Sequence, residues 1–131
     1  MLLPHGLVVA VVDGEKLELY RNVGDEIAVD LARMQSPKLD AHNKSSGTRH
    51  VTSAANPGHL LREDAHAAAV VDWLNRQVMA GEITHLVIVA APRTLGEMRL
   101  RYDKQLQAAL LGEEHKELIG RSAEEVRAAL R

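Results

Sequence analysis

Two unbroken apolar runs constrain the fold of this chain more than any other feature of its sequence. They read GLVVAVV at residues 6–12 and THLVIVAA at residues 84–91. A continuous run suits a strand that is covered on both faces, whereas a strand with one face in water alternates apolar and polar residues. We therefore predict two buried strands, with packed structure on both sides of their sheet.

The segments that follow the first run predict an antiparallel meander. Asp13-Gly14 is a dipeptide that favours a tight hairpin turn. Residues 15–21 alternate, with Leu17 and Leu19 on one face, and residues 26–34 place Ile27, Val29 and Leu31 on one face. We expect three antiparallel strands at residues 6–12, 15–21 and 26–34.

Residues 35–63 break this regular pattern. They are rich in Ser, Asn, His, Gly and Pro and show no sustained period. An irregular loop of this length inside a compact domain is uncommon, and it is either functional or disordered. It also carries several cations and hydroxyl side chains, which suit contact with phosphate or protein.

The second half alternates helices and strands. A helix is predicted at residues 64–80, where Gly81 supplies the stop. It is followed by the strand at 84–91, a helix at 95–110 and a short edge strand at 115–120. The second helix carries an apolar stripe, formed by Leu95, Met98, Tyr102, Leu106, Ala109 and Leu110.

A last helix opens at Ser122, and Glu125 three residues later completes a capping box. The β-α-β steps imply parallel pairing with right-handed crossovers. The expected fold is therefore a single α/β domain over residues 1–131, with three antiparallel strands followed by alternating helices and strands. This is a ribonuclease H-like topology.

Composition excludes several classes of function. The sequence has no Phe, one Trp and two Tyr, which weakens any role as a base-stacking platform. A net charge of −2 gives no global attraction to nucleic acid, and the lack of Cys excludes disulfides and thiol catalysis. The first apolar run is too short to span a bilayer and lacks a basic flank. We expect a cytoplasmic protein that does not insert into membranes.

The segment APRTLGEMR at residues 91–99 has two interpretations. Thr94 and Glu97 have the spacing of a capping box, which would explain both residues structurally. The segment also follows an inner strand, where α/β sheets bind ligands, and a helix N-terminus attracts anions. Arg93 would supply charge, Gly96 would let a ligand approach, and Arg99 borders the apolar stripe. An anion or RNA-phosphate site is the functional alternative.

Catalytic signatures are weak in this sequence. A two-metal nuclease needs several grouped carboxylates, and the fourth strand ends in AAPR without an acid. There is no HExxH, no pair of His residues at helical spacing and no GxSxG. We predict no catalytic residues, no metal and no cofactor. A small hydrolase or phosphate-ligand enzyme that uses the crevice after the fourth strand, with His50 as base, remains an alternative.

Several segments together resemble the bacterial host-attachment protein family, named for a requirement in attachment to host cells. They are LPHGLVVAVVDGEKLELYRN, SGTRHVTSAANPG, EDAHAAAVVDWLNRQVMAGEITHLVIVAAPRTLGEMR and GEEHKEL, which cover nearly the whole chain. The family is similar to the central domain of archaeal and eukaryotic class 1 release factors. The resemblance implies that domain's ribonuclease H-like fold.

The resemblance does not imply the hydrolytic activity of the release factors. Their loop between the third strand and the long helix carries a Gly-Gly-Gln tripeptide that reaches the peptidyl-transferase centre. Here that region contains Ser46-Gly47-Thr48-Arg49-His50, and the tripeptide is absent. The chain also has Asp103 where the family often has His, and residues 116–119 depart from a KDLT-like stretch.

The sequence favours a non-catalytic module that binds RNA, a ribosome-associated partner or another protein, and that affects attachment only indirectly. The candidate binding residues lie in the long loop and after the fourth strand, and they are Arg49, His50, Arg93, Thr94, Gly96 and Arg99. A further alternative is a structural module that forms a homodimer through a strand edge at residues 116–119.

Overall fold

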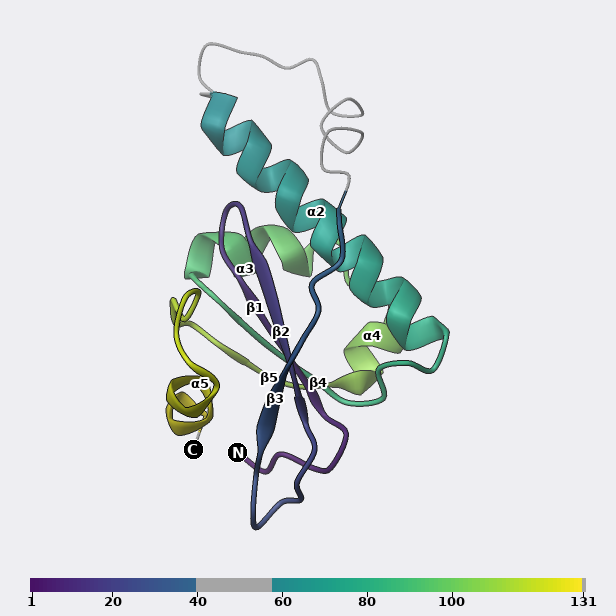
Figure 1. Cartoon of the computed structure of the whole chain (residues 1–131). Coiled ribbons are helices and arrows are strands. Elements are labelled where there is room, and N and C mark those ends of the chain that lie inside the picture. Colours follow the sequence, from purple (N-terminus) through teal and green to yellow (C-terminus); the bar gives the residue numbers. More distant parts are fainter. Residues whose placement is uncertain (40–57, 131) are drawn as a thin grey trace.

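Five strands pair in one mixed sheet, in the order β3-β2-β1-β4-β5 (Figure 1). The computed structural model describes residues 1–39 and 58–130. The antiparallel pairs are β1–β2 and β2–β3, and the parallel pairs are β1–β4 and β4–β5. The strand bounds are Val8–Val12 for β1, Leu17–Asn22 for β2, Leu31–Met34 for β3, Leu86–Ala90 for β4 and Leu110–Glu114 for β5.

Helices cover both faces of this sheet. The long helix α2 contacts α3 and α4 on one face, whereas α5 lies on the opposite face (Figure 1). The helix bounds are Gly58–Met79 for α2, Pro92–Arg99 for α3, Lys104–Ala109 for α4 and Ala123–Ala129 for α5. The domain is therefore an α/β sandwich with its sheet in the middle.

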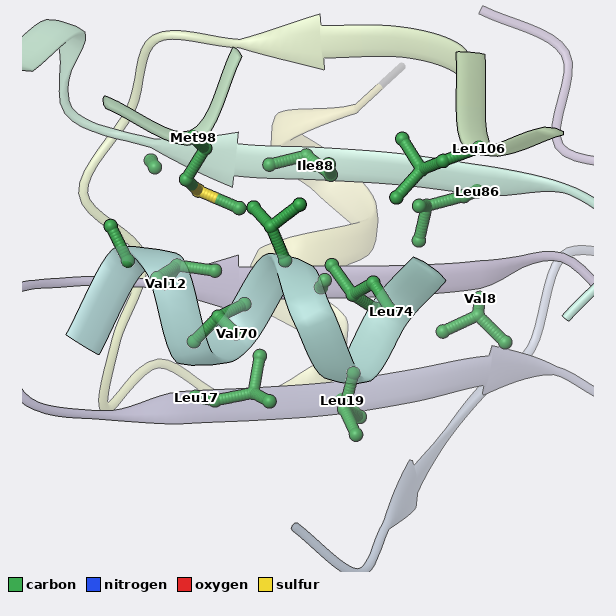
Figure 2. Close-up of a cluster of buried hydrophobic side chains, with 14 of the residues drawn as sticks. Val8, Val12, Leu17, Leu19, Val70, Leu74, Leu86, Ile88, Met98 and Leu106 are labelled. Carbon is green, nitrogen blue, oxygen red and sulfur yellow. The ribbon is translucent and has the colours of Figure 1, made fainter. Parts of the chain in front are cut away.

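The central strands divide their side chains between two cores. Val8, Ala10 and Val12 of β1 pack under α2, α3 and α4, while Val9 and Val11 pack on the α5 side. Figure 2 shows the first core, in which Val70 and Leu74 of α2 lie over the sheet. All five residues of β1 and of β4 are buried, so the prediction of two strands covered on both faces is confirmed.

The third strand is shorter than predicted, because the chain bends at residues 26–28 and the strand begins only at Leu31. The Asp25 carboxylate accepts hydrogen bonds from the backbone N–H of Ile27 and of Ala28, at 2.9 and 2.7 Å. This local bonding competes with strand formation, as is typical of Asp in turns. Ile27 is 97% exposed, so its predicted place on a buried strand face is wrong.

The predicted helix at residues 95–110 is two helices, α3 and α4. Asp103 caps α4 by accepting from the N–H of Leu106 at 2.8 Å, and Asn75 of α2 bonds the backbone of Arg101 and Asp103. These side chains satisfy the polar groups that the break exposes. The chain then enters β5 at Leu110, so the predicted strand at residues 115–120 is also wrong.

Helix α2 begins at Gly58, earlier than predicted, so residues 58–63 of the expected loop are helical. Residues 40–57 of that loop lie outside the described residues. The turn at Asp13, the glycine with positive φ at Gly81 and the capping box of Ser122 with Glu125 are confirmed. Within the described ranges, no helix is long and apolar enough to cross a membrane.

Candidate anion-binding site

The start of α3 differs from the predicted capping box. The helix begins at Pro92 with Ala91 as its N-cap, and no side chain caps it. Proline suits the first helical position because its φ is already helical and it has no N–H to satisfy. Thr94 therefore lies inside the first turn, where its hydroxyl does not cap the helix. The prediction of a Thr94–Glu97 capping box is wrong.

Arg93 is held by two carboxylates at the start of α2. Its Nη2 lies 2.8 Å from Asp64 Oδ1, and its Nε lies 3.9 Å from Glu63 Oε1. The side chain remains 47% exposed. These carboxylates offset the positive charge that the sequence places beside the N-terminus of α3, and a ligand anion there would have to compete with them.

Arg99 is paired as well, at the other end of α3. Its Nε and Nη2 donate to Glu113 Oε1 at 3.0 and 2.6 Å, and the Tyr102 hydroxyl donates to Glu113 Oε2 at 2.7 Å. Burial raises the pKa of Glu113, but these hydrogen bonds outweigh it and hold the pKa below its ordinary value of 4.5. Burial and the same hydrogen bond raise the pKa of Tyr102.

The structure therefore does not gather the predicted residues into one site. Arg93 and Arg99 lie at the two ends of α3 with separate acidic partners. Gly96 is exposed, and a Cβ there would meet no heavy atom within 4 Å. Arg49 and His50 fall outside the described part of the chain.

A different cavity lies beside the start of β2, and sequence analysis did not identify it. It has a volume of about 500 Å³, is open to solvent, and is lined by residues 15–18, by Arg33 of β3, by residues 36–39 and by His66 of α2. Three of its lining side chains are basic, namely Lys16, Arg33 and Lys38, and two are acidic, namely Glu15 and Glu18.

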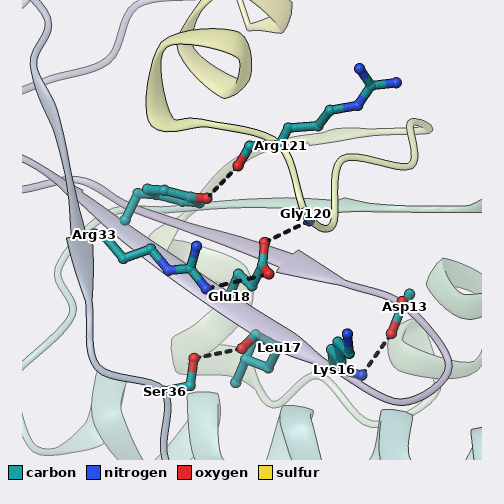
Figure 3. A network of polar contacts seen from close by, with 9 residues as sticks. Asp13, Lys16, Leu17, Glu18, Arg33, Ser36, Gly120 and Arg121 are labelled. Carbon is teal, nitrogen blue, oxygen red and sulfur yellow. Dashed lines mark hydrogen bonds and ion pairs between the residues drawn. The ribbon is translucent and has the colours of Figure 1, made fainter.

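The cavity exists because β3 stops early. Met34, the last residue of β3, pairs with Leu19, so the first residues of β2 have no strand partner among the described residues on that side. The Ser36 hydroxyl instead donates to the Leu17 carbonyl at 2.6 Å (Figure 3). On the α2 side, His66 Nε2 lies 3.1 Å from the Lys16 carbonyl, and it must donate because a carbonyl can only accept.

Glu18 lines the cavity, and its side chain is nearly buried. Its Oε2 lies 3.3 Å from Arg33 Nη2, and its Oε1 accepts the backbone N–H of Gly120 at 3.1 Å (Figure 3). Tyr20, two residues along β2, lies under the Arg33 guanidinium and donates from its hydroxyl to the Arg121 carbonyl at 3.2 Å. The buried carboxylate is therefore fully partnered within the fold.

The described residues contain no group of three or more His, Cys, Asp or Glu side chains placed to hold a metal ion. No curated protein matches the sequence. A family model does match, over residues 7–130, and it is described as bacterial archaeo-eukaryotic release factor family 12. Since this match covers almost the whole sequence, the chain belongs to that family of release-factor-like proteins.

Proposed function

We propose that this chain is a non-catalytic release-factor-like module that binds RNA in a ribosome-associated setting. The family match over residues 7–130 carries the proposal. We propose further that residues 1–131 form one domain with the ribonuclease H-like arrangement of the release-factor central domain. The strand order, with an antiparallel meander followed by parallel β4 and β5, supports that arrangement.

The absence of catalysis is inferred from the sequence of the release-factor loop. Peptidyl-tRNA hydrolysis by class 1 release factors depends on a Gly-Gly-Gln tripeptide, and this sequence does not contain it. The corresponding region keeps cations and hydroxyls, including Arg49 and His50. Such side chains contact phosphate without any requirement for hydrolytic chemistry. Recognition of RNA could therefore be retained without the reaction.

We propose Arg49, His50, Arg93, Thr94, Gly96 and Arg99 as RNA contacts, with unequal weights. Arg93 and Arg99 each keep about half of their side chain exposed while paired to carboxylates. A phosphate must therefore share these guanidinium groups with acids already present. The expected contribution of Arg93 and of Arg99 to RNA affinity is therefore modest.

Fluorescence anisotropy with a single-stranded RNA of about eight nucleotides tests the proposal. We expect affinity to fall as salt rises from about 50 to 200 mM, because cations released from RNA drive binding. Arg93→Ala should bind the RNA more weakly than the native chain at the same salt concentration. Arg127→Ala is the matched control, since Arg127 is also ion-paired, to Glu124, but lies on α5. Binding without salt dependence, unchanged in Arg93→Ala, would reject the proposal.

We also propose that the protein acts in the cytoplasm and affects attachment to host cells only indirectly. Pull-down from native lysate, with and without ribonuclease, would separate partners held by RNA from partners held by protein contacts. Partners that disappear after ribonuclease treatment support an RNA-borne association. Recovery of the native protein in the cell-surface fraction would contradict an indirect role.

The edge strand β5 supports a second proposal, a homodimer. It is the last strand of the sheet and carries Leu111, which is 44% exposed. An edge strand presents unpaired backbone groups that a second copy can bond. Light scattering at several concentrations should show a mass that doubles, and Leu111→Lys should prevent it. A constant monomer mass would exclude this dimer.

A further inference from the structure

We propose that the cavity beside the start of β2 binds the phosphate-bearing nucleotide unit of an RNA chain or of a free nucleotide. Where the phosphate belongs to an RNA chain, this inference rests on the RNA binding proposed above. It places the contact on β2 and the segment after β3, away from the start of α3 that the sequence suggested.

Two lysines of this cavity have no ion-pair partner among the described residues. Within the fold, Arg33 balances the negative charge of Glu18, and the backbone N–H of Gly120 donates a hydrogen bond to its carboxylate. Lys16 and Lys38 form no ion pair with any residue in the described part of the chain, unlike Arg93 and Arg99. Two lysines that have no ion pair among the described residues line one concave surface, and lysine binds a phosphate as a point charge.

Hydrogen bonds and apolar side chains fix the shape of the cavity. The Ser36 hydroxyl and His66 Nε2 already donate to backbone carbonyls of β2, so they hold the walls together. Leu17, Pro37 and Leu39 provide an apolar surface between the charged groups. A volume of about 500 Å³ lies in the usual range for small-ligand sites. This combination fits a phosphate joined to a less polar body.

The acidic side chains distinguish a nucleotide from a bare anion. Glu15 lines the same cavity and is exposed. A carboxylate repels inorganic phosphate, but it accepts hydrogen bonds from ribose hydroxyls or exocyclic amines. A ligand with a phosphate at one end and donors at the other satisfies both kinds of lining group. Inorganic phosphate alone satisfies only the lysines.

Backbone amide NMR of the full chain provides the test, with adenosine 5′-monophosphate, inorganic phosphate and the RNA oligonucleotide as separate probes. We expect the mononucleotide and the RNA to shift the amides of residues 15–18, of Ser36 and of Lys38, and phosphate to shift them less. The double variant Lys16→Ala/Lys38→Ala should bind RNA at least about tenfold more weakly, because two charge-assisted contacts are lost.

The matched control is Arg101→Ala/Lys104→Ala, which removes the same charge from two exposed positions, Arg101 between α3 and α4 and Lys104 at the first residue of α4. It should change RNA affinity less than about twofold, because these residues lie outside the cavity. An unchanged unfolding midpoint in both variants shows that each still folds. Comparison at equal net charge separates a contact in the cavity from a general electrostatic effect.

The outcomes separate the assignment of this cavity from the broader proposal that the chain binds RNA. If RNA binds both double variants equally, the cavity assignment is overturned while RNA binding stands. If the mononucleotide shifts the cavity amides but RNA does not bind, the cavity is a site for free nucleotides and the proposed function fails. If neither the mononucleotide nor the RNA shifts these amides, the cavity assignment is overturned, whatever RNA affinity the anisotropy measurement gives.

Discussion

At the scale of single residues, Asn22 organises the polar end of the sheet. It is 0% exposed, and its Nδ2 donates to the carbonyls of Leu3 and Pro4 at 2.8 and 3.2 Å. Its Oδ1 accepts from the N–H of Gly24 and of Asp30 at 2.9 and 3.0 Å. No sequence pattern indicated this role, because an Asn at the end of a strand reads as an ordinary turn residue.

Asn22→Asp should therefore destabilise the domain. The carboxylate can still accept from the two N–H groups, but it cannot donate to the buried carbonyls. We expect a loss of about 2–4 kcal/mol in the free energy of unfolding, measured with urea. Asn75→Asp is the control, because the bond of Asn75 to the Arg101 carbonyl is exposed. Equal losses in both variants would contradict this account.

The Arg99–Glu113–Tyr102 group predicts a specific pH dependence of stability. The pKa of Glu113 is below its ordinary value in the folded state, so its contribution is full above pH 4.5 and is lost as the pH falls through the folded value. We expect Glu113→Gln to flatten the unfolding free energy against pH below about pH 4.5. If the unfolding free energy of this variant falls with pH as steeply as that of the native chain, other carboxyl groups dominate the pH dependence of stability.

At the scale of elements, the two capping-box sequences have opposite outcomes. Ser122 and Glu125 bond each other's backbone, at 3.1 and 2.9 Å, whereas the Thr94 and Glu97 pair is displaced by Pro92. The spacing of residue types was the same in both cases. The deciding factor was a proline two residues upstream, which begins the helix earlier than the threonine would.

This difference predicts unequal effects of two alanine substitutions. Ser122→Ala removes a cap and should cost about 1 kcal/mol, while Thr94→Ala should change stability by less than about 0.5 kcal/mol. Thermal or urea unfolding of both variants measures the contrast. A loss at Thr94 as large as that at Ser122 would mean that the Thr94 hydroxyl has a structural role that its helix position does not explain.

Two glycines provide a second contrast between elements. A Cβ at Gly24 would collide with the Ala28 carbonyl oxygen, whereas one at Gly96 meets no heavy atom within 4 Å. Gly24→Ala should destabilise by at least about 2 kcal/mol, and Gly96→Ala should stabilise α3 by up to about 1 kcal/mol. Unfolding measurements test both. Reduced RNA binding in a more stable Gly96→Ala would show that a ligand approaches this backbone.

At the scale of the whole molecule, the sequence predicted the centre of the fold better than its margins. The runs that form β1 and β4 each lie within one continuous segment of the sequence, and the local pattern of apolar residues reveals them. The cavity depends on Lys16, Arg33, Lys38 and His66, which come from separate segments. Their approach is set by the β2–β3 register and by the early end of β3, and neither is visible in local pattern.

The overall charge predicts how strongly salt should affect RNA binding. The net charge is −2, so long-range attraction is weak and the cations in direct contact with RNA provide most of the effect. Two or three phosphate contacts correspond to a slope of about −1.4 to −2.1 in log affinity against log salt. Lys16→Ala/Lys38→Ala should reduce this slope by about 1.4. An unchanged slope in this double variant would show that the cavity lysines do not contact phosphate.

The bonds from Glu18 and Tyr20 to the backbone of Gly120 and Arg121 also have a kinetic consequence. They join parts of the chain that are 102 and 101 residues apart. Contacts this distant in sequence close a long loop, so they should form after the folding transition state. Tyr20→Phe should then accelerate unfolding in a stopped-flow experiment and leave the folding rate unchanged. These bonds would set how long the folded chain lasts, with little influence on how quickly it forms.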